Sequence, residues 1–124
     1  MAGLPPSARL RRAAEFAAFR TASGKVQTRH FLVRMLPSAA GYPRLGLAVS
    51  RKVSKRAVAR NRIKRIIRES FRVRRAALPG VDVLVIARPS AAATDNPSLR
   101  ADLEVAWQKL AALMAKPAPG TMGG

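Results

Sequence analysis

The sequence predicts a small α+β fold in which helices pack on a small sheet as an α-β sandwich. The continuous apolar run VDVLVIA, residues 81–87, is bounded by Pro-Gly and Arg-Pro and is typical of a strand buried in mid-sheet. Apolar residues recur at helical spacing before and after it, which gives the order helix, strands, helix, strand, helix. The length of 124 residues points to one domain, which we assign to residues 8–115, with flexible tails at 1–7 and 116–124.

The first half of the chain predicts one helix and two strands. The Ala-rich stretch from Ala8 to about Ala22 suits a helix that Gly24 ends. Residues 30–36, HFLVRML, alternate as a strand does. Residues 44–50, RLGLAVS, predict a second strand, and the turn-forming residues between the two strands predict that they pair as a hairpin.

The second half predicts two helices around the buried strand. From about Ala57 to Arg74, apolar residues follow the i, i+3, i+4 rule of an amphipathic helix. After the strand, Asn96 and Pro97 suit an N-cap and first turn. The core stripe of the helix over residues 57–74 is predicted to be Ile63, Ile66, Ile67 and Phe71. That of the C-terminal helix is predicted to be Leu99, Leu103, Ala106, Trp107, Leu110 and Met114.

The charge of the chain limits its possible partners. Lys and Arg number 24 against 6 acids, which gives a net charge of +18. A folded protein with this charge suits a polyanion, nucleic acid being the commonest and a membrane surface the second candidate. The absence of cysteine excludes disulfides, thiol nucleophiles and thiolate metal sites. No signal peptide and no run of about 18 apolar residues stands out, so we expect a cytoplasmic protein.

Half of the basic residues lie between Arg51 and Arg75, where only Glu69 opposes them. At about 100° per residue, one polar face of the helix gathers six residues, and like charges four residues apart on it destabilise an isolated helix. Such a face is often merely solvated, but phosphate binding explains why the cost is tolerated. The six residues are Arg60, Asn61, Lys64, Arg65, Arg68 and Arg72.

The segment ARNRIKRIIRESFR, residues 59–72, resembles the signature "RNR" helix of the bacterial ribonuclease P protein family. It is preceded by GLAVSRKVSKRAV and followed by VDVLVIARP, in the family's order and spacing. The resemblance extends from about Leu10 to Leu110 and is highly specific. It implies the order α-β-β-β-α-β-α and a left-handed β-α-β crossover around the basic helix, against the usual right-handed rule.

The resemblance also implies an accessory subunit of a ribonucleoprotein endonuclease that removes the 5′ leader from precursor tRNA. In that family the RNA supplies the active site and binds the catalytic Mg²⁺, so we expect no catalytic residue, metal site or cofactor on the protein itself. The residues agree, because His30 is the only histidine and no carboxylate pair stands out. The implied partners are ribonuclease P RNA and precursor tRNA, with no membrane and no obligate protein partner.

The family's RNA-binding residues can be matched to positions in this chain. The helix that contacts the catalytic RNA corresponds to Arg60, Asn61, Arg62, Lys64, Arg65 and Arg68, and the basic segment before it to Arg51, Lys52, Lys55 and Arg56. The cleft that binds the single-stranded leader, between the first helix and one sheet face, corresponds to Phe16, Phe19, Arg20, Leu32 and Arg34. Stacking on an aromatic ring suits a leader of variable sequence.

Two departures from the family pattern bear on this cleft. A second Phe often follows the first after four residues, whereas here Phe19 follows Phe16 after three and Arg20 occupies the fourth position. Arg34 stands where some members have Tyr, so the leader preference is expected to differ. Plain core packing is an equally open interpretation for both phenylalanines.

Other functions remain open from the sequence alone. A structural RNA-binding protein, such as a ribosomal component, would have a similar composition, and stimulation of leader cleavage would distinguish the two. A DNA-compacting protein would bind with steep salt dependence but without preference for RNA. Membrane binding is disfavoured because the basic helix lacks the exposed Trp and Leu of interfacial helices. A nuclease that acts without an RNA subunit is rejected.

Overall fold

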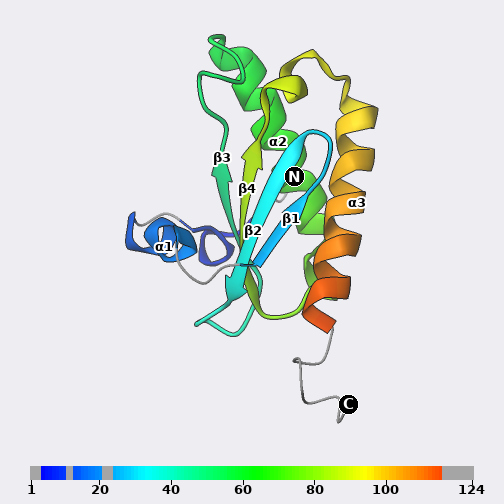
Figure 1. Cartoon of the computed structure of the whole chain (residues 1–124). Helices are drawn as coiled ribbons and strands as arrows, with labels where there is room; N and C mark the ends of the chain where they lie inside the picture. Colours follow the sequence, from blue (N-terminus) through cyan, green and yellow to red (C-terminus); the bar gives the residue numbers. More distant parts are fainter. Residues whose placement is uncertain (1–3, 11–12, 21–23, 116–124) are drawn as a thin grey trace.

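The computed structural model describes residues 4–10, 13–20 and 24–115. Its elements follow the order α-β-β-β-α-β-α that the resemblance implied (Figure 1). They are α1 (Ala13–Ala17), β1 (Gly24–Gln27), β2 (Phe31–Pro37), β3 (Arg44–Ala48), α2 (Ala57–Arg74), β4 (Val81–Ala87) and α3 (Asn96–Ala115). Short 3-10 turns are η1 (Pro6–Ala8), η2 (Ala18–Arg20), η3 (Arg75–Ala77) and η4 (Pro89–Ala93).

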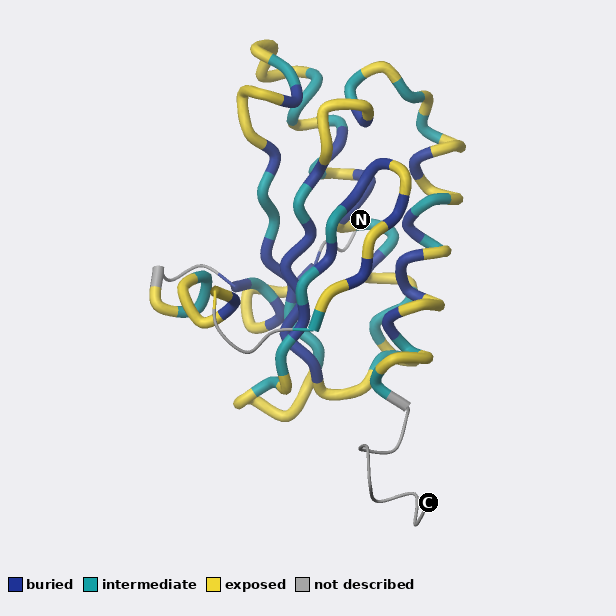
Figure 2. The backbone as a smooth tube through the Cα atoms, viewed as in Figure 1, coloured by how far each residue is buried: buried dark blue, intermediate teal, exposed yellow. Residues whose placement is uncertain are grey.

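The four strands form one sheet in the order β1-β2-β4-β3. Strand β2 runs antiparallel to both β1 and β4, whereas β3 runs parallel to β4. The predicted hairpin of β2 and β3 is therefore wrong, because β4 lies between them. Strand β4 takes an interior place because its residues, which alternate between the two faces of the sheet, are all buried except the half-buried Ile86. Figure 2 shows the burial of each residue along the backbone. The pattern did not locate β1, a strand of four residues in which only Val26 is buried.

The connection from β3 through α2 to β4 is a left-handed crossover. In Figure 1 both strands run upward, β4 lies to the right of β3, and α2 passes behind the sheet. A right-handed connection would place the helix in front of the sheet in this view. The crossover leaves β3 as an edge strand beside α2, and this arrangement positions the site described below.

Helices α2 and α3 cover one face of the sheet with a continuous core. All four predicted core residues of α2, Ile63, Ile66, Ile67 and Phe71, are buried against strand residues such as Val83. The core stripe of α3 is confirmed from Leu99 to Leu110, and Met114 packs partly buried at its edge. Between the two helices, the Trp107 indole N–H donates to Ser70 Oγ at 2.7 Å, and its ring meets that of Phe71 edge-on at 5.8 Å. Trp107 is thus a core residue, as predicted.

The N-cap of α3 is Asp95 rather than Asn96. The Ser98 N–H donates to Asp95 Oδ1 at 2.8 Å, and Leu99 N–H donates to the Asp95 carbonyl at 3.0 Å. Hydrogen bonds from Ser98 lower the pKa of the Asp95 carboxyl below its ordinary value. The Asn96 side chain is thereby left to accept a hydrogen bond from α2.

The N-terminal region is less helical than its composition predicts. Among the described residues, α1 begins at Ala13, whereas residues 8–10, which were also expected to be helical, follow the free edge of β3, where Leu10 N–H donates to Leu45 O at 2.8 Å. Leu4 is buried in the main core, at 3% exposure. Residues 4–7 therefore belong to the folded unit rather than to a tail. Residues 1–3 and the predicted tail 116–124 lie outside the described residues.

Candidate nucleic-acid interface

The outward face of α2 carries cations without acidic partners. Asn61, Arg65 and Arg68 are exposed, and Lys64 is half-buried on the side toward β3. Within the part of the chain that the structure describes, Lys64, Arg65 and Arg68 form no ion pair. Because no carboxylate neutralises them, these groups are available for an external anion.

Arg60 turns back onto the loop that precedes α2. Its Nη1 donates to the carbonyls of Ser54 and Lys55, both at 3.0 Å. These contacts hold the basic segment of residues 50–56 against the first turn of the helix. The four flanking basic residues predicted to bind RNA are all exposed there: Arg51, Lys52, Lys55 and Arg56.

Arg62 joins α2 to the turn between η4 and α3. Its Nη1 donates to Asn96 Oδ1 at 2.6 Å and to the Thr94 carbonyl at 3.3 Å, and its Nη2 donates to the Ala92 carbonyl at 3.2 Å. The guanidinium is therefore occupied within the protein. In the Arg-Asn-Arg triplet both arginines bind neighbouring turns, and the exposed Asn61 stands between them.

The opposite face of the sheet carries α1 and the phenylalanines of the predicted cleft. Phe19 is 2% exposed and packs with Leu10 and Leu84 in a second, smaller core. Phe19 thus has the packing role that the sequence left open for it. Phe16 is only half-buried, and its ring lies so close to Gly46 of β3 that a Cβ there would be 2.8 Å from Phe16 Cε1.

The other predicted cleft residues lie on the same sheet face. Arg34 of β2 is aligned through Leu84 with Gly46, so it lies two strands from the Phe16 ring. Two residues further along the strands, Leu32, Ile86 and Ala48 are aligned in the next row on this face, and all three are half-buried. Arg20, at the end of η2, is exposed. An apolar strip with Arg34 next to it therefore lies on the sheet face that carries α1.

An ion-pair network fixes α1 over this face. Arg44 of β3 donates to both carboxylate oxygens of Asp82 at 2.8 Å and to Glu15 Oε2 of α1 at 3.0 Å. All three side chains are largely buried. Hydrogen bonding to Asp82 raises the pKa of Arg44 above its ordinary value. The network thus positions Phe16 relative to β3.

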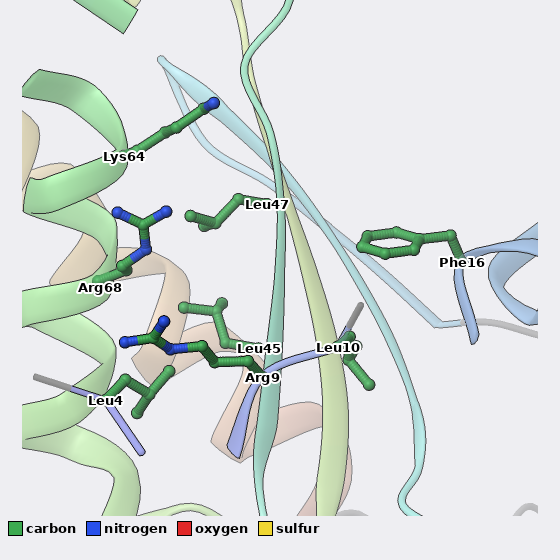
Figure 3. A pocket seen from close by; sticks show the side chains of 8 residues that line it. All are labelled: Leu4, Arg9, Leu10, Phe16, Leu45, Leu47, Lys64 and Arg68. Atoms are coloured by element: carbon green, nitrogen blue, oxygen red, sulfur yellow. The ribbon is translucent and has the colours of Figure 1, made fainter. Parts of the chain in front are cut away.

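A groove of about 290 Å³ joins the two predicted halves of the interface (Figure 3). Lys64 and Arg68 reach into it from α2 on one side of β3, and Phe16 closes it on the other side. Arg9 adds a third cation from the N-terminal segment, which the sequence had placed in a helix. Leu4, Leu10, Leu45 and Leu47 complete its lining.

Arg9 and Gly46 could not be recognised as parts of this site from local sequence patterns. Arg9 enters because its segment pairs with Leu45, an edge contact between residues far apart in the chain. Gly46 is needed because the Phe16 ring occupies the space of a side chain. Neither contact follows from a local pattern.

His30 and Asp102 serve structural roles. Asp102 of α3 accepts hydrogen bonds from Thr28 Oγ1 at 2.6 Å and from His30 N at 2.9 Å, and His30 Nδ1 lies 2.8 Å from Ser90 Oγ. These contacts tie the β1–β2 turn to α3. No cluster of three or more His, Cys, Asp or Glu residues that could hold a metal ion occurs in residues 4–10, 13–20 and 24–115. None of the helices described there is long and apolar enough to cross a membrane.

Comparison with known proteins shows which family the chain resembles. The family profile of Ribonuclease P matches residues 4–111. The Ribonuclease P protein component of Chromohalobacter salexigens is 44% identical over 109 residues, which cover 87% of this chain and 85% of the relative. That of Thioalkalivibrio sulfidiphilus is 39% identical over 115 residues, covering 93% of this chain and 96% of the relative.

Solved structures agree with the sequence comparison. The RNase P protein of Staphylococcus aureus superposes with a TM-score of 0.77 at 32% identity, covering 84% of this chain and 97% of that protein. The RNase P protein of Thermotoga maritima gives a TM-score of 0.73 at 30% identity, covering 82% and 96% of the two chains. The chain therefore belongs to the ribonuclease P protein family.

Proposed function

We propose that this chain is the protein subunit of ribonuclease P, which binds the catalytic RNA and the 5′ leader of precursor tRNA and assists endonucleolytic removal of the leader. The observation that carries the proposal is the groove at the edge of β3, where Phe16 faces Lys64 and Arg68 across the strand. One strand of RNA could contact a stacking surface and phosphate-binding cations at the same place.

The catalytic RNA is bound by the outward face of α2 and by the loop before it. Lys64, Arg65 and Arg68 form no ion pair with the described residues and supply cations for phosphates, and Asn61 offers an amide that can donate and accept. Arg60 and Arg62 support this surface by holding the two turns that flank it. The exposed Arg51, Lys52, Lys55 and Arg56 extend the surface beyond the helix.

The leader is bound on the sheet face beside α1. The half-buried ring of Phe16 and the strip formed by Leu32, Ile86 and Ala48 offer apolar surface to unstacked bases. Arg34 lies in the row next to this strip, and the exposed Arg20 adds a second cation on η2; both favour the backbone phosphates. Contacts of this kind are tolerant of base sequence, which suits leaders that differ between precursors.

The chemistry belongs to the RNA subunit in this proposal. The protein contributes positive charge and a leader-binding surface, and it has no catalytic residue, cofactor or metal of its own. The Mg²⁺ that the holoenzyme requires is bound through the RNA. The protein acts in the cytoplasm and needs no further protein partner.

Binding measurements test this proposal directly. We expect the protein to bind a bacterial ribonuclease P RNA more tightly than an unrelated RNA of the same length, with affinity that falls steeply as salt increases. The assembled holoenzyme should bind a precursor tRNA more tightly than the matching mature tRNA. Equal affinity for both RNAs of each pair would indicate a non-specific or purely structural RNA-binding protein.

A further inference from the structure

An exposed aromatic side chain lies at the far end of the basic helix from the Arg-Asn-Arg triplet. Tyr42, the only tyrosine of the chain, is 38% exposed in the loop between β2 and β3. The guanidinium carbon of Arg75, which follows α2, lies 5.9 Å from the centroid of its ring. This distance is that of a cation–π contact, and an exposed aromatic ring and a guanidinium group both have flat surfaces of the kind on which nucleobases stack.

A hollow of about 370 Å³ lies next to this pair. It is lined by Arg72 and Arg75 together with the apolar side chains of Pro43, Ala76 and Leu78. Its size falls within the range of small-ligand sites. A flat, partly apolar ligand could occupy the hollow and contact two guanidinium groups at once.

The charges around the hollow favour an anion. Neither Arg72 nor Arg75 forms an ion pair within the described part of the chain. Arg44, the neighbour of this loop, holds Asp82 and Glu15, so these two carboxylates are already paired. The helix dipole stabilises cations near a helix C-terminus, which accounts for the two arginines. It does not account for the exposed aromatic ring beside them.

The loop that carries Tyr42 is held in place. Ser38 N–H donates to the Gly80 carbonyl at 2.9 Å, and Gly41 turns the chain with a φ of +83°. A Cβ on Gly80 would lie 2.9 Å from the Gly41 carbonyl oxygen, so the two loops are closely packed. The Tyr42 ring is therefore presented on a fixed loop, which reduces the entropy lost on binding.

The hollow also continues the basic row of α2. Lys64, Arg68 and Arg72 are spaced four residues apart and share one side of the helix. At about 1.5 Å per residue, Arg72 lies roughly 12 Å along the axis from Lys64. An RNA strand or loop bound at the Lys64 end of α2 would therefore find further cations leading to Tyr42.

We propose that Tyr42, Arg72 and Arg75 form a site for one unpaired RNA nucleotide, whose base stacks on the Tyr42–Arg75 pair and whose phosphate is bound by Arg72. This site rests on the proposed function and adds a second contact region at the opposite end of α2. The nucleotide belongs either to the catalytic RNA or to the precursor tRNA, and the two sources share the same chemistry.

The test compares three variants with a matched control. Tyr42→Ala removes the stacking surface, Tyr42→Phe preserves it, and Arg72→Gln removes one phosphate contact. Arg100→Gln is the control, because it removes the same charge from an exposed position of α3, in a different hollow that Glu69 and Glu104 also line. The fluorescence of the buried Trp107 verifies the fold of each variant. Affinity is measured for ribonuclease P RNA alone, and then for precursor tRNA with the assembled holoenzyme, across a series of salt concentrations.

We expect Tyr42→Ala to weaken RNA binding roughly 5-fold to 100-fold without changing the salt dependence, and Tyr42→Phe to bind like the unmodified protein. Arg72→Gln should lower the slope of log affinity against log salt by about one, whereas Arg100→Gln should not. A loss seen with ribonuclease P RNA assigns the nucleotide to the catalytic RNA, and a loss seen only with precursor tRNA assigns it to the substrate.

Unchanged binding of both RNAs by Tyr42→Ala would overturn the nucleotide site, as would an equal effect of Arg72→Gln and Arg100→Gln. In either case the unmodified protein would still prefer ribonuclease P RNA, so the proposed function would stand. Absence of that preference in the unmodified protein would instead contradict the proposed function, on which the site depends.

Discussion

The basic residues of α2 are of two kinds: some donate hydrogen bonds to neighbouring turns of the protein, and others face the groove or solvent. Arg62 donates to Asn96, Thr94 and Ala92, whereas Lys64 has no ion pair among the described residues and lines the groove. The family resemblance assigns both residues to RNA binding. Their different surroundings predict that they act differently.

Arg62→Ala should destabilise the fold, because it leaves acceptors of the η4–α3 turn without their charged donor. We expect a loss of about 1–3 kcal/mol in the free energy of unfolding, measured by urea denaturation with Trp107 fluorescence. Lys64→Ala should leave stability unchanged and lower the salt slope of RNA binding by about one. A stable Arg62→Ala protein with a reduced salt slope would mean that Arg62 contacts phosphate instead.

Phe16 and Gly46 provide a second test at this scale. Phe16→Ala should weaken binding of leader-bearing precursor tRNA by about 1–3 kcal/mol and affect mature tRNA much less. Gly46→Ala should reproduce part of this loss, because its Cβ would displace the Phe16 ring. Both are measured as holoenzyme affinities for the two tRNAs. Equal weakening for precursor and mature tRNA would place Phe16 in the core or against the tRNA body.

Residue patterns predicted the core better than the site. The stripe of Ile63, Ile66, Ile67 and Phe71 follows from helical periodicity alone, and all four are buried. The partners of Arg62 and the closeness of Phe16 to Gly46 depend on how distant segments pack. A sequence pattern carries no information about such contacts.

At the scale of elements, those with a clear apolar pattern followed the sequence, whereas the N-terminal segment and the four-residue strand β1 did not. Helix α2 and strand β4 have the predicted bounds because each carries a strong periodic or continuous apolar pattern. The N-terminal segment departs from its helical composition because it pairs with the edge of β3 and buries Leu4. Tertiary contacts outweigh helix propensity in so short a segment.

The start of α3 predicts a pH-dependent stability. Because hydrogen bonds from Ser98 lower the pKa of Asp95, its carboxylate stabilises the folded state above its unfolded pKa. This contribution is lost as the pH falls below about 4 and through the lowered folded value. Urea denaturation across this range should show a smaller acid-induced loss for Asp95→Asn, whose amide still caps the helix. An unchanged pH profile in Asp95→Asn would exclude this role for Asp95.

At the scale of the whole molecule, the left-handed crossover determines how the interface is assembled. It places α2 beside the edge strand β3, and the groove between them brings Phe16 and the basic helix together. Local patterns predicted the helices and strands, but the pairing of β2 and β3 was wrong and the crossover came only from the family resemblance. Strand order depends on which strand is buried on both faces, and handedness on packing that no single segment reveals.

The most direct test of the account is removal of the 5′ leader from a precursor tRNA by a bacterial ribonuclease P RNA at low Mg²⁺, with and without this protein. Few cations then screen the phosphates, so the basic subunit should restore cleavage. Combined Lys64→Ala and Arg68→Ala substitutions should abolish much of that restoration, while Arg100→Gln should not. Cleavage that the unmodified protein fails to stimulate, although it binds the RNA, would contradict the account and leave only a structural RNA-binding protein.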